Sequence, residues 1–302
     1  MKLIIESGAT KTDFSILDVA ELQRFRLGGI NLATMPEKDI SEILESAIEK
    51  LESVVALEQI EEIFFYGAGL VPTDTGGMKE PSVSVSVKKI DEILRKRFCK
   101  TVSVEYNSDL TASARSLWGR ESGISVILGT GSNSCFFDGC RVISNVRPCG
   151  YIIGDFGSGA ALGKTFLADF LQNQMPENLS ARVEEDYALD YKSVVSNLYN
   201  GVAPARYLAS FAPYILSLTK EKGFDTGSLQ YLEEIITENF RVFIRRCLLQ
   251  YDTSRYSVRV TGSFGCAARN YLEKAGADFG VRFTKFLSSP IDGLIKYHSE
   301  NV

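Results

Sequence analysis

Two short turns of small residues constrain the fold of this chain more than any other feature. The first stands in "LIIESGATKTDF" (3–14), between an apolar run and a segment that alternates polar and apolar residues. The second stands in "GISVILGTGSNSCFF" (123–137), again between an apolar run and a second strand-like segment. Each pattern predicts a strand, a glycine turn and another strand. Two halves that begin in the same way indicate a duplicated α/β architecture with a cleft between the halves.

Hydrophobic spacing predicts the elements around these turns. In the first half they are strands at 2–6, 12–18, 22–27, 60–66 and 102–106 and helices over 36–55, 88–98 and 110–117. In the second half they are two strands within 123–137 on either side of the glycine turn, strands at 141–145, 256–261 and 278–286, helices over 157–171, 203–222, 228–251 and 264–275, and a C-terminal helix.

Charge and length exclude several classes of function. A chain of 302 residues predicts two domains of ordinary size. The net charge of −5 and the lack of a Lys/Arg-rich block argue against a nucleic-acid partner. No apolar run reaches membrane-spanning length and the N-terminus lacks a signal-peptide core, so we expect a cytoplasmic protein without a membrane partner.

The cysteines and the single histidine limit the chemistry further. Six cysteines include no CxxC spacing, which argues against a zinc or cluster site. His298 is the only histidine, and it falls in the last turn of the C-terminal helical pattern. We therefore expect His298 to have a surface or cap role, and we expect any general base to be a carboxylate.

Asp109 is a carboxylate in a position to act as that base. It follows the strand at 102–106 and begins the helix over 110–117. Asn107, Ser108 and Asp109 are all good N-caps, so the simpler alternative is that Asp109 only caps the helix. A carboxylate at the carboxyl end of a strand also faces the crevice where α/β sheets bind ligands, where it could take a proton from a substrate hydroxyl.

Two further glycine segments are candidates for ligand contacts. "CGYIIGDFGSGAALG" (149–163) has five glycines with Asp155 among them, which indicates a loop shaped around a ligand or, more simply, a helix cap. "SVRVTGSFGCAARNYL" (257–272) places Gly262 and Ser263 between a strand and a helix, either for packing or for the flat approach of an adenine ring. A glycine turn that follows a strand can also hold phosphate through backbone N–H groups.

The order of these motifs resembles the sugar-kinase/Hsp70/actin superfamily, and within it the N-acetylglucosamine kinase-like group that includes the BadF/BadG/BcrA/BcrD ATPases. "ESGATKTDF" is similar to the first phosphate motif, "VILGTGSNS" to the second, "NSDLTASA" to the connecting motif and "VTGSFG" to the adenosine motif. "GDFGSGAALG" is similar to the GDEGS-type segment of the amino-sugar kinases and is the most specific of the five. The resemblance covers nearly the whole chain. It implies an α/β protein with two ribonuclease H-like (actin-like ATPase) domains at 1–112 and 113–288, each a mixed sheet with flanking helices, and a C-terminal helix at 289–302 that packs back on the first domain.

The resemblance also implies roles for individual residues. Asp109 is the implied general base on the sugar hydroxyl, and Glu6 is implied to lie near Mg²⁺. The implied ATP contacts are Gly8, Ala9, Thr10, Lys11 and Thr12 in the first turn, Thr130 and Gly131 in the second, and Gly262 and Ser263 near adenosine. The implied sugar contacts besides Asp109 are Asn31, Ser132, Asn133, Gly150 and Asp155.

Four positions depart from the family pattern. Glu6 stands where the family has Asp, which changes the metal geometry by one methylene group. Phe156 replaces the acidic residue of GDEGS, and Ala33 stands where some amino-sugar kinases carry an aromatic residue. Ser263 replaces a glycine of the adenosine motif. None of these changes removes the base, so the pattern still predicts catalysis.

These patterns favour an ATP- and Mg²⁺-dependent kinase that phosphorylates a hydroxyl of an amino sugar. They are compatible with a homodimer. N-acetylglucosamine is the first choice of substrate and N-acetylmuramate the second. Two alternatives stay open. One is an activator ATPase of a radical acyl-CoA dehydratase, which needs a metal cluster bridged by cysteines. The other is a non-catalytic sugar or nucleotide sensor, which Glu6 and Phe156 favour.

Overall fold

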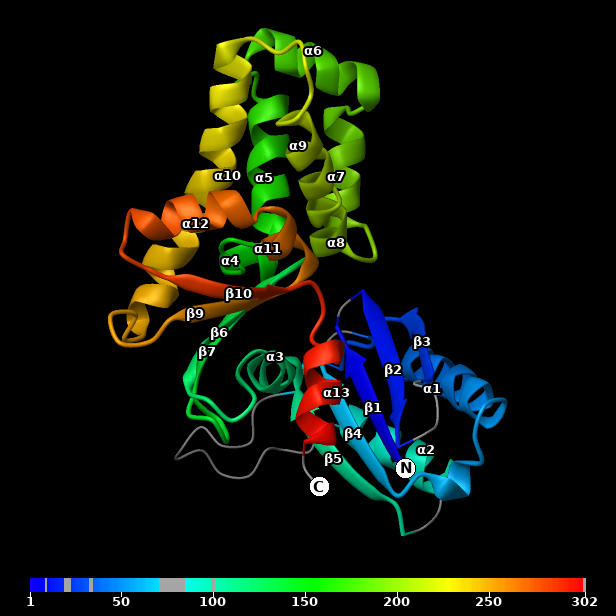
Figure 1. Cartoon of the computed structure of the whole chain (residues 1–302). Helices are drawn as coiled ribbons and strands as arrows, with labels where there is room; N and C mark the ends of the chain where they lie inside the picture. The colour runs from blue at the N-terminus through cyan, green and yellow to red at the C-terminus, as the bar shows by residue number, and fades with distance from the viewer. Residues whose placement is uncertain (9, 19–22, 33–34, 71–84, 99–100, 301–302) are drawn as a thin grey trace. The chain divides into compact units, whose positions relative to one another are not determined.

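The chain divides into two compact units (Figure 1). The computed structural model describes residues 1–8, 10–18, 23–32, 35–70, 85–98 and 101–300, so the predictions for Ala9 and Ala33 lie outside the described residues. Unit 1 comprises Met1–Ser122, Phe137–Ser144 and Ser289–Val302, and unit 2 comprises Gly123–Phe136 and Asn145–Ser288. The first break between the units therefore comes after the helix that begins at Asp109. The boundary expected from the sequence, at 112/113, lies within that helix.

Unit 1 is built on a mixed five-stranded sheet in the order β3-β2-β1-β4-β5. The pairs β1–β2 and β2–β3 are antiparallel, and the pairs β1–β4 and β4–β5 are parallel. Parallel strands are usually buried on both faces, and β1 is buried along nearly its whole length. The bounds are β1 Lys2–Ser7, β2 Lys11–Leu17, β3 Gln23–Gly28, β4 Glu62–Gly67 and β5 Ser103–Ser108.

Helices cover both faces of this sheet. Helices α1 (Glu37–Glu52) and α2 (Val85–Arg97) pack with the odd-numbered residues of β1, Leu3 and Ile5, on one face. The buried positions of α1 recur at three- and four-residue intervals, which is the pattern of an amphipathic helix. Helices α3 (Asp109–Trp118) and α13 (Ile291–Ser299) pack around Ile4 on the other face. A short 3₁₀ helix, η1 (Leu57–Gln59), precedes β4.

The prediction that His298 has a surface or cap role is wrong. Its side chain is only 2% exposed, its ring stacks on Phe64 with centroids 3.8 Å apart, and Nε2 is hydrogen-bonded to the Tyr66 hydroxyl at 2.8 Å. Because α13 lies on the sheet, the last turn of the helix faces the core of unit 1 and not solvent. Burial, with the positive charge of Arg115 as the second cause, lowers the pKa of His298 to about 4.

Unit 2 contains most of the second sheet, in the order β10-β9-β6-β7-β8, together with a mainly helical insertion. Strand β9 is parallel to both β6 and β10. The strands are β6 Gly123–Leu128, β7 Ser132–Phe137, β8 Val142–Val146, β9 Val258–Thr261 and β10 Phe283–Leu287. The helices are α4 Gly150–Ile153, α5 Gly159–Leu171, α6 Glu177–Asp186, α7 Tyr191–Tyr199, α8 Pro204–Ala209, α9 Phe211–Leu218, α10 Thr226–Arg246, η2 Leu248–Gln250, α11 Ser263–Ala267 and α12 Arg269–Ala277.

Several element predictions for unit 2 need correction. The helices expected over 203–222 and 264–275 are each divided in two, at Ser210 and Ala268. The strand expected at 278–286 begins only at Phe283, because the Val281 N–H donates to the Gly276 carbonyl at 2.9 Å and Gly280 has a φ of 68°. Helices α6 and α7 were not predicted because few of their residues are buried, so their apolar pattern is weak.

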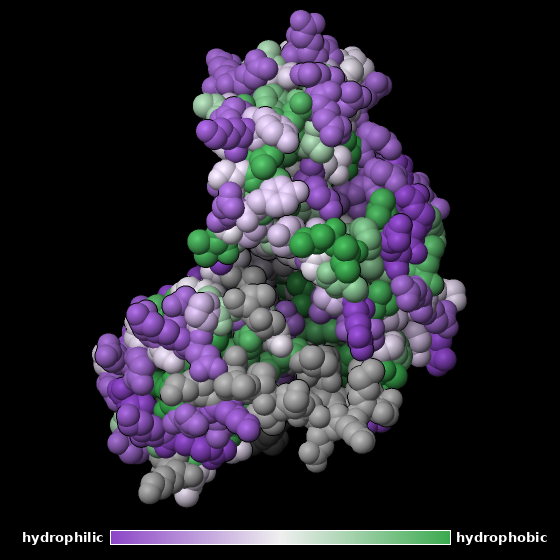
Figure 2. All heavy atoms as spheres, turned by 180° about the vertical axis from the view of Figure 1, so that it is seen from behind, coloured by the Kyte–Doolittle hydropathy of each residue, from purple (hydrophilic) through white to green (hydrophobic). Residues whose placement is uncertain are grey.

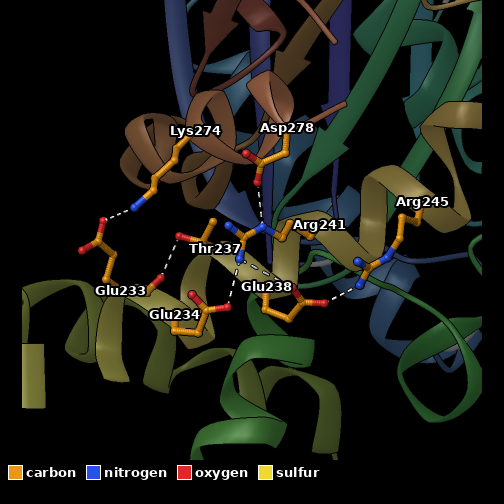
Figure 3. A network of polar contacts seen from close by, with 8 residues as sticks. All are labelled: Glu233, Glu234, Thr237, Glu238, Arg241, Arg245, Lys274 and Asp278. Carbon is orange, nitrogen blue, oxygen red and sulfur yellow. Dashed lines mark hydrogen bonds and ion pairs between the residues drawn. The ribbon is translucent and has the colours of Figure 1, made fainter. Parts of the chain in front are cut away.

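The surface of the described residues is mainly hydrophilic in the view of Figure 2. On the surface of unit 2, the ion pairs of Arg241 with Asp278 and of Glu233 with Lys274 join α10 to α12 and its C-cap, and Arg241 also pairs with Glu234 on α10 itself (Figure 3). No described helix combines the length and the apolar character that a membrane span requires.

Candidate functional site

The carboxyl ends of the parallel strands of unit 1 gather its candidate residues. Ser7 of β1 is in register with Gly67 of β4, which is in register with Ser108 of β5. Asp109 follows Ser108 directly and begins α3. Ligands of α/β sheets bind at this end of the strands, so Glu6 and Asp109 lie where a ligand is expected.

Glu6 is a buried carboxyl group among other acidic residues. It is 5% exposed and lies directly opposite Asp13 on the neighbouring antiparallel strand. Burial, followed by the negative charge of Asp13, raises the pKa of Glu6 to about 8; Asp109 adds to this effect, whereas Lys11 and Arg26 oppose it. A cation that binds beside this buried carboxyl group stabilises its ionised form, which burial and the neighbouring acidic residues disfavour.

Asp13 is already paired, and the sequence analysis did not single it out. Arg26 binds it with two nitrogens, Nε to Oδ1 at 2.7 Å and Nη2 to Oδ2 at 3.2 Å, from the strand register opposite. Lys11 Nζ lies 3.6 Å from Oδ2, and the Ser289 hydroxyl donates to the same oxygen at 3.3 Å. The alternation of Asp13 with apolar residues in a strand was the only sequence signal for it.

Asp109 does not serve as the cap of its helix. The N-cap is Ser108, whose Oγ accepts from the Thr111 N–H at 3.1 Å. Asp109 is half-buried, and burial raises its pKa to about 6, while the nearby backbone N–H groups of Asp109 and Leu110 oppose the rise. The simpler alternative from the sequence, a capping role, therefore belongs to Ser108, and the Asp109 carboxylate is available for other contacts.

The other predicted residues of unit 1 flank the β1–β2 turn or follow β3. The Gly8 N–H donates to the Lys11 carbonyl at 3.0 Å and closes the turn. The Thr12 side chain is fully buried and its hydroxyl donates to the Gly28 carbonyl at 2.8 Å. Asn31 forms an isolated parallel bridge with Ala68 just after β4.

In unit 2 the turn after β6 is bonded to the start of α5. The Gly129 N–H donates to the Gly131 carbonyl at 3.0 Å, and the Gly159 and Ala160 N–H groups donate to the carbonyls of Gly129 and Thr130 at 2.9 and 3.1 Å. Thus the backbone of Thr130 and Gly131, the ATP contacts that the family resemblance implies in this turn, is held by hydrogen bonds to the start of α5.

Asp155 lies against this turn. Its Oδ1 accepts from the Ser132 N–H at 3.3 Å, and burial raises its pKa. A Cβ atom on Gly131 would stand 2.9 Å from Asp155 Oδ2, so a larger residue here would displace the Asp155 carboxylate from this position. The structure therefore brings together Gly131, Ser132 and Asp155, three residues that the sequence analysis connected only through the family resemblance.

Asn133 and Gly150 are held at the edges of this group. Asn133 Oδ1 accepts from Asn145 Nδ2 at 2.8 Å and from the Ser134 N–H at 2.9 Å. Gly150 is exposed and starts α4, where its carbonyl accepts from the Gly154 N–H at 2.8 Å. Asn145 was not predicted, because its pairing with Asn133 depends on the β7–β8 contact and leaves no short-range signal in the sequence.

Gly262 occupies the turn after β9. Its φ is 115°, and a Cβ atom there would stand 2.2 Å from the Leu128 carbonyl oxygen at the end of β6. Its N–H donates to the Leu287 carbonyl of β10 at 2.9 Å, and the exposed Ser263 begins α11. Gly262 thus lies beside the residue that precedes the Gly129–Gly131 turn.

Neither of two surface hollows, with volumes of about 320 and 290 Å³, is lined by a residue predicted for the site. In unit 2 the larger hollow lies at Arg182, and in unit 1 the other lies between β3 and α1. Among the described residues, no three His, Cys, Asp or Glu side chains are grouped so as to hold a metal ion by themselves.

Comparison with known proteins defines the class. The chain matches a solved structure described as a candidate N-acetylglucosamine kinase from Porphyromonas gingivalis, with 32% identity, a TM-score of 0.86, and 100% of this chain and 99% of that chain covered. A second such candidate, from Chromobacterium violaceum, matches with 18% identity and a TM-score of 0.71 over 98% of both chains. A glucokinase of the ROK family from Streptomyces griseus, solved with glucose and AMPPNP, matches with 15% identity and a TM-score of 0.59 over 99% of this chain and 98% of that one. No family model and no curated protein matches in the sequence comparisons.

The fold is therefore that of the two-domain sugar kinases with the actin-like ATPase architecture, which confirms the predicted α/β class. The 32% sequence identity over the whole chain shows a family relationship in addition to a shared fold. This protein belongs to the same family as the candidate N-acetylglucosamine kinase of Porphyromonas gingivalis.

Proposed function

We propose that this protein is an ATP- and Mg²⁺-dependent kinase that phosphorylates a hydroxyl of an amino sugar, N-acetylglucosamine in the first place and N-acetylmuramate in the second. The BadF/BadG/BcrA/BcrD group is the proposed place within the superfamily. The observation that carries the proposal is Asp109: a half-buried carboxylate at the carboxyl end of parallel strands, relieved of capping by Ser108, in a chain with 32% identity to a candidate N-acetylglucosamine kinase.

Asp109 is the proposed general base. Phosphoryl transfer needs an alcohol oxygen that loses its proton as the new bond to phosphorus forms, and a carboxylate within hydrogen-bond reach can accept that proton. A pKa of about 6 keeps Asp109 mainly ionised at neutral pH while leaving it more basic than an exposed aspartate. The remainder of the catalysis is positioning of the two substrates and exclusion of water.

The residues present fit a bound Mg·ATP. Magnesium keeps several waters and is usually held by one or two carboxylates together with substrate phosphates, so the single buried Glu6 suffices on the protein side. Bound Mg²⁺ supplies neutralisation of the phosphate charge. Gly8, Thr10 and Lys11 in unit 1 and Thr130 and Gly131 in unit 2 are proposed to bind phosphates, with Gly262 and Ser263 near adenosine.

The proposed sugar contacts use both side chains and backbone. Asp155 accepts hydrogen bonds from sugar hydroxyls, and Asn31 and Asn133 can both donate and accept. Ser132 and Gly150 complete the proposed set. The Asp155 carboxylate is well placed for this role because it is fixed by the Ser132 N–H and by the close approach of Gly131.

A coupled ADP-release assay over a panel of hexoses and amino sugars tests the proposal. We expect ADP release that depends on N-acetylglucosamine and exceeds the rate with glucose. Product analysis by NMR then identifies the phosphorylated hydroxyl. Absence of sugar-stimulated turnover across the panel contradicts the proposal.

A sensor without turnover is the second candidate, and Phe156 is the observation that favours it. Phe156 stands in place of the acidic residue of the GDEGS segment, and the Arg246 guanidinium lies over its ring at 5.0 Å. Arg246 thereby contacts an aromatic face in the same loop as Asp155. Calorimetry that detects tight sugar binding without ADP formation favours the sensor.

A further inference from the structure

Two buried hydroxyls flank the β1–β2 turn and bond to the segment that carries Asn31. Ser7 and Thr12 face each other in the β1–β2 register, and neither is exposed to solvent. Thr12 Oγ1 donates to the Gly28 carbonyl at 2.8 Å, and the Ile30 N–H donates to Ser7 Oγ at 2.8 Å. The two hydroxyl oxygens lie 2.6 Å apart.

The number of hydrogens limits these bonds to two patterns. Each hydroxyl carries one hydrogen, so either Thr12 donates to the Gly28 carbonyl and Ser7 to Thr12, or Thr12 donates to Ser7 and Ser7 to the Ile30 carbonyl. The first pattern uses the 2.8 and 2.6 Å contacts, whereas the second needs the longer 3.1 Å contact with Ile30, so the distances favour the first. The chain of bonds runs from the Ile30 N–H through Ser7 and Thr12 to the Gly28 carbonyl, so it begins and ends on one segment.

The same segment is held from its other side by backbone bonds. The Leu32 N–H donates to the Ala68 carbonyl at 2.9 Å, and the Ala68 N–H donates to the Ser7 carbonyl at 2.9 Å. Asn31 itself is paired with Ala68 in a parallel bridge. The position of Asn31 thus depends on Ser7 twice, through its hydroxyl and through its carbonyl.

We propose that Thr12 is a positioning residue, not a phosphate ligand, and that with Ser7 it fixes segment 28–32 and hence Asn31. Its side chain is fully buried and its only hydrogen is donated to Gly28, so its hydroxyl has none left for a phosphate oxygen. The β1–β2 turn, which is proposed to bind phosphate, and segment 28–32, which carries Asn31, are therefore joined by hydrogen bonds of these two hydroxyl groups. The identity of the ligand at Asn31 rests on the proposed function, whereas the positioning of the segment does not.

Four variants separate the hydroxyl from the shape of the side chain. Thr12→Val keeps the shape and removes the hydroxyl, Thr12→Ser keeps the hydroxyl, and Ser7→Ala breaks the chain at its other member. Ser15→Ala is the matched control, because Ser15 lies on the same strand, is equally buried and has a hydroxyl without a partner among the described residues.

Hydrogen exchange of the ligand-free protein tests the positioning directly. Removing one partner leaves buried polar groups unsatisfied, so we expect the Ile30 amide to exchange roughly tenfold faster in Thr12→Val and Ser7→Ala. Thr12→Ser and Ser15→Ala should exchange like the unaltered protein. Equal exchange in Thr12→Val and Ser15→Ala overturns the proposal, and so does failure of Thr12→Ser to restore protection.

Calorimetry with N-acetylglucosamine in the absence of nucleotide tests the consequence for binding. We expect Thr12→Val to weaken sugar binding about tenfold and Thr12→Ser to restore it. If Thr12→Val changes only the affinity for AMPPNP, the residue contacts phosphate after all and the proposal is wrong. If the unaltered protein binds no amino sugar, the proposed function is wrong, and the exchange experiment still decides the role of Thr12.

Discussion

The two units present their candidate ligand groups by different physical means. In unit 1 these groups are ionisable side chains that the fold buries: burial raises the pKa of Glu6 to about 8 and of Asp109 to about 6. In unit 2 they are mainly backbone groups of glycine turns, where a Cβ atom would meet the Leu128 backbone at Gly262 and would displace the Asp155 carboxylate at Gly131. The charged networks of unit 2 lie on its surface, as on α10 and α12 (Figure 3).

This difference indicates a division of roles. The protonation state of a buried ionisable group changes with pH and with a charge bound nearby, and proton transfer and metal binding require such a group. A glycine turn depends on its backbone shape, because its close contacts are disturbed when a side chain is added. We therefore expect substitutions of the ionisable ligand groups of unit 1 to change rates and pH dependence, and substitutions in the glycine turns of unit 2 to change binding and stability.

The largest expected effect is the loss of Asp109, the proposed base, in unit 1. Asp109→Asn keeps the size of the side chain and removes its ability to take a proton, so kcat should fall by roughly 10³-fold, within the range of general-base catalysis. Asp155→Asn in unit 2 is the matched control and should mainly raise the KM for the sugar. Steady-state ADP release measures both, and an equal fall of kcat in the two variants contradicts the division of roles.

Next in size is the closed turn of unit 2. Gly262→Ala adds a Cβ atom 2.2 Å from the Leu128 carbonyl oxygen at a φ of 115°, so the turn must move. We expect a loss of about 3 kcal/mol in the free energy of unfolding. Gly150→Ala is the control: its φ of 71° is also positive but no atom lies within 4 Å, so only the backbone strain of about 1 kcal/mol remains. Urea denaturation compares them, and equal losses would show that the close approach does not matter.

His298 gives unit 1 a pH-dependent stability. Its pKa is lowered to about 4 by burial, so as pH falls below the ordinary value of 6.5 the unfolded chain takes up a proton before the folded one. The contribution is fully present above pH 6.5 and is lost as pH falls to about 4, on the order of 3 kcal/mol in total. His298→Asn should flatten this part of the curve of unfolding free energy against pH. An unchanged slope would show that the imidazole is not the responsible group.

The pH–rate profile gives a smaller but more specific effect. At saturating Mg·ATP, where a bound Mg²⁺ keeps Glu6 ionised, kcat/KM for the sugar should be level near pH 7 and fall about tenfold per pH unit below the Asp109 pKa of about 6, since the proposed base must be ionised. Glucose and N-acetylglucosamine should give the same break, because the titrating group belongs to the protein and not to the sugar. A break near pH 4 would assign the proton transfer to an exposed carboxylate instead.

The sequence predicted most of the sheet and much of the site, and the reasons differ between elements. Strands such as β1 and β4 are bounded by glycine turns and have strong apolar patterns, so their positions follow from local residues. Asp109 was recognisable because it combines a strand end with a helix start. That Ser108 takes over the capping could not be predicted, because Asn107, Ser108 and Asp109 are locally equivalent as caps.

The missed features all depend on contacts between distant segments. His298 is buried only because α13 returns to the sheet of unit 1, where Tyr66 lies 232 residues earlier in the chain. The Ser7–Thr12 pair needs the strand register and the path of segment 28–32, and Asn145 reaches Asn133 only through the sheet. Helices α6 and α7 bury so few side chains that hydrophobic spacing carries little information about them.

The smallest expected effect concerns the surface network of unit 2. Lys274 and Glu233 are each about half exposed, so water already solvates both charges and side-chain entropy opposes their pairing. Lys274→Gln should therefore change the unfolding free energy by less than about 0.5 kcal/mol, and added salt should remove even that difference. Urea denaturation at low and high ionic strength measures it. A loss several times larger would mean that unit 2 also depends on charged side chains, and the contrast with unit 1 would then apply only to the ligand groups and not to the units as a whole.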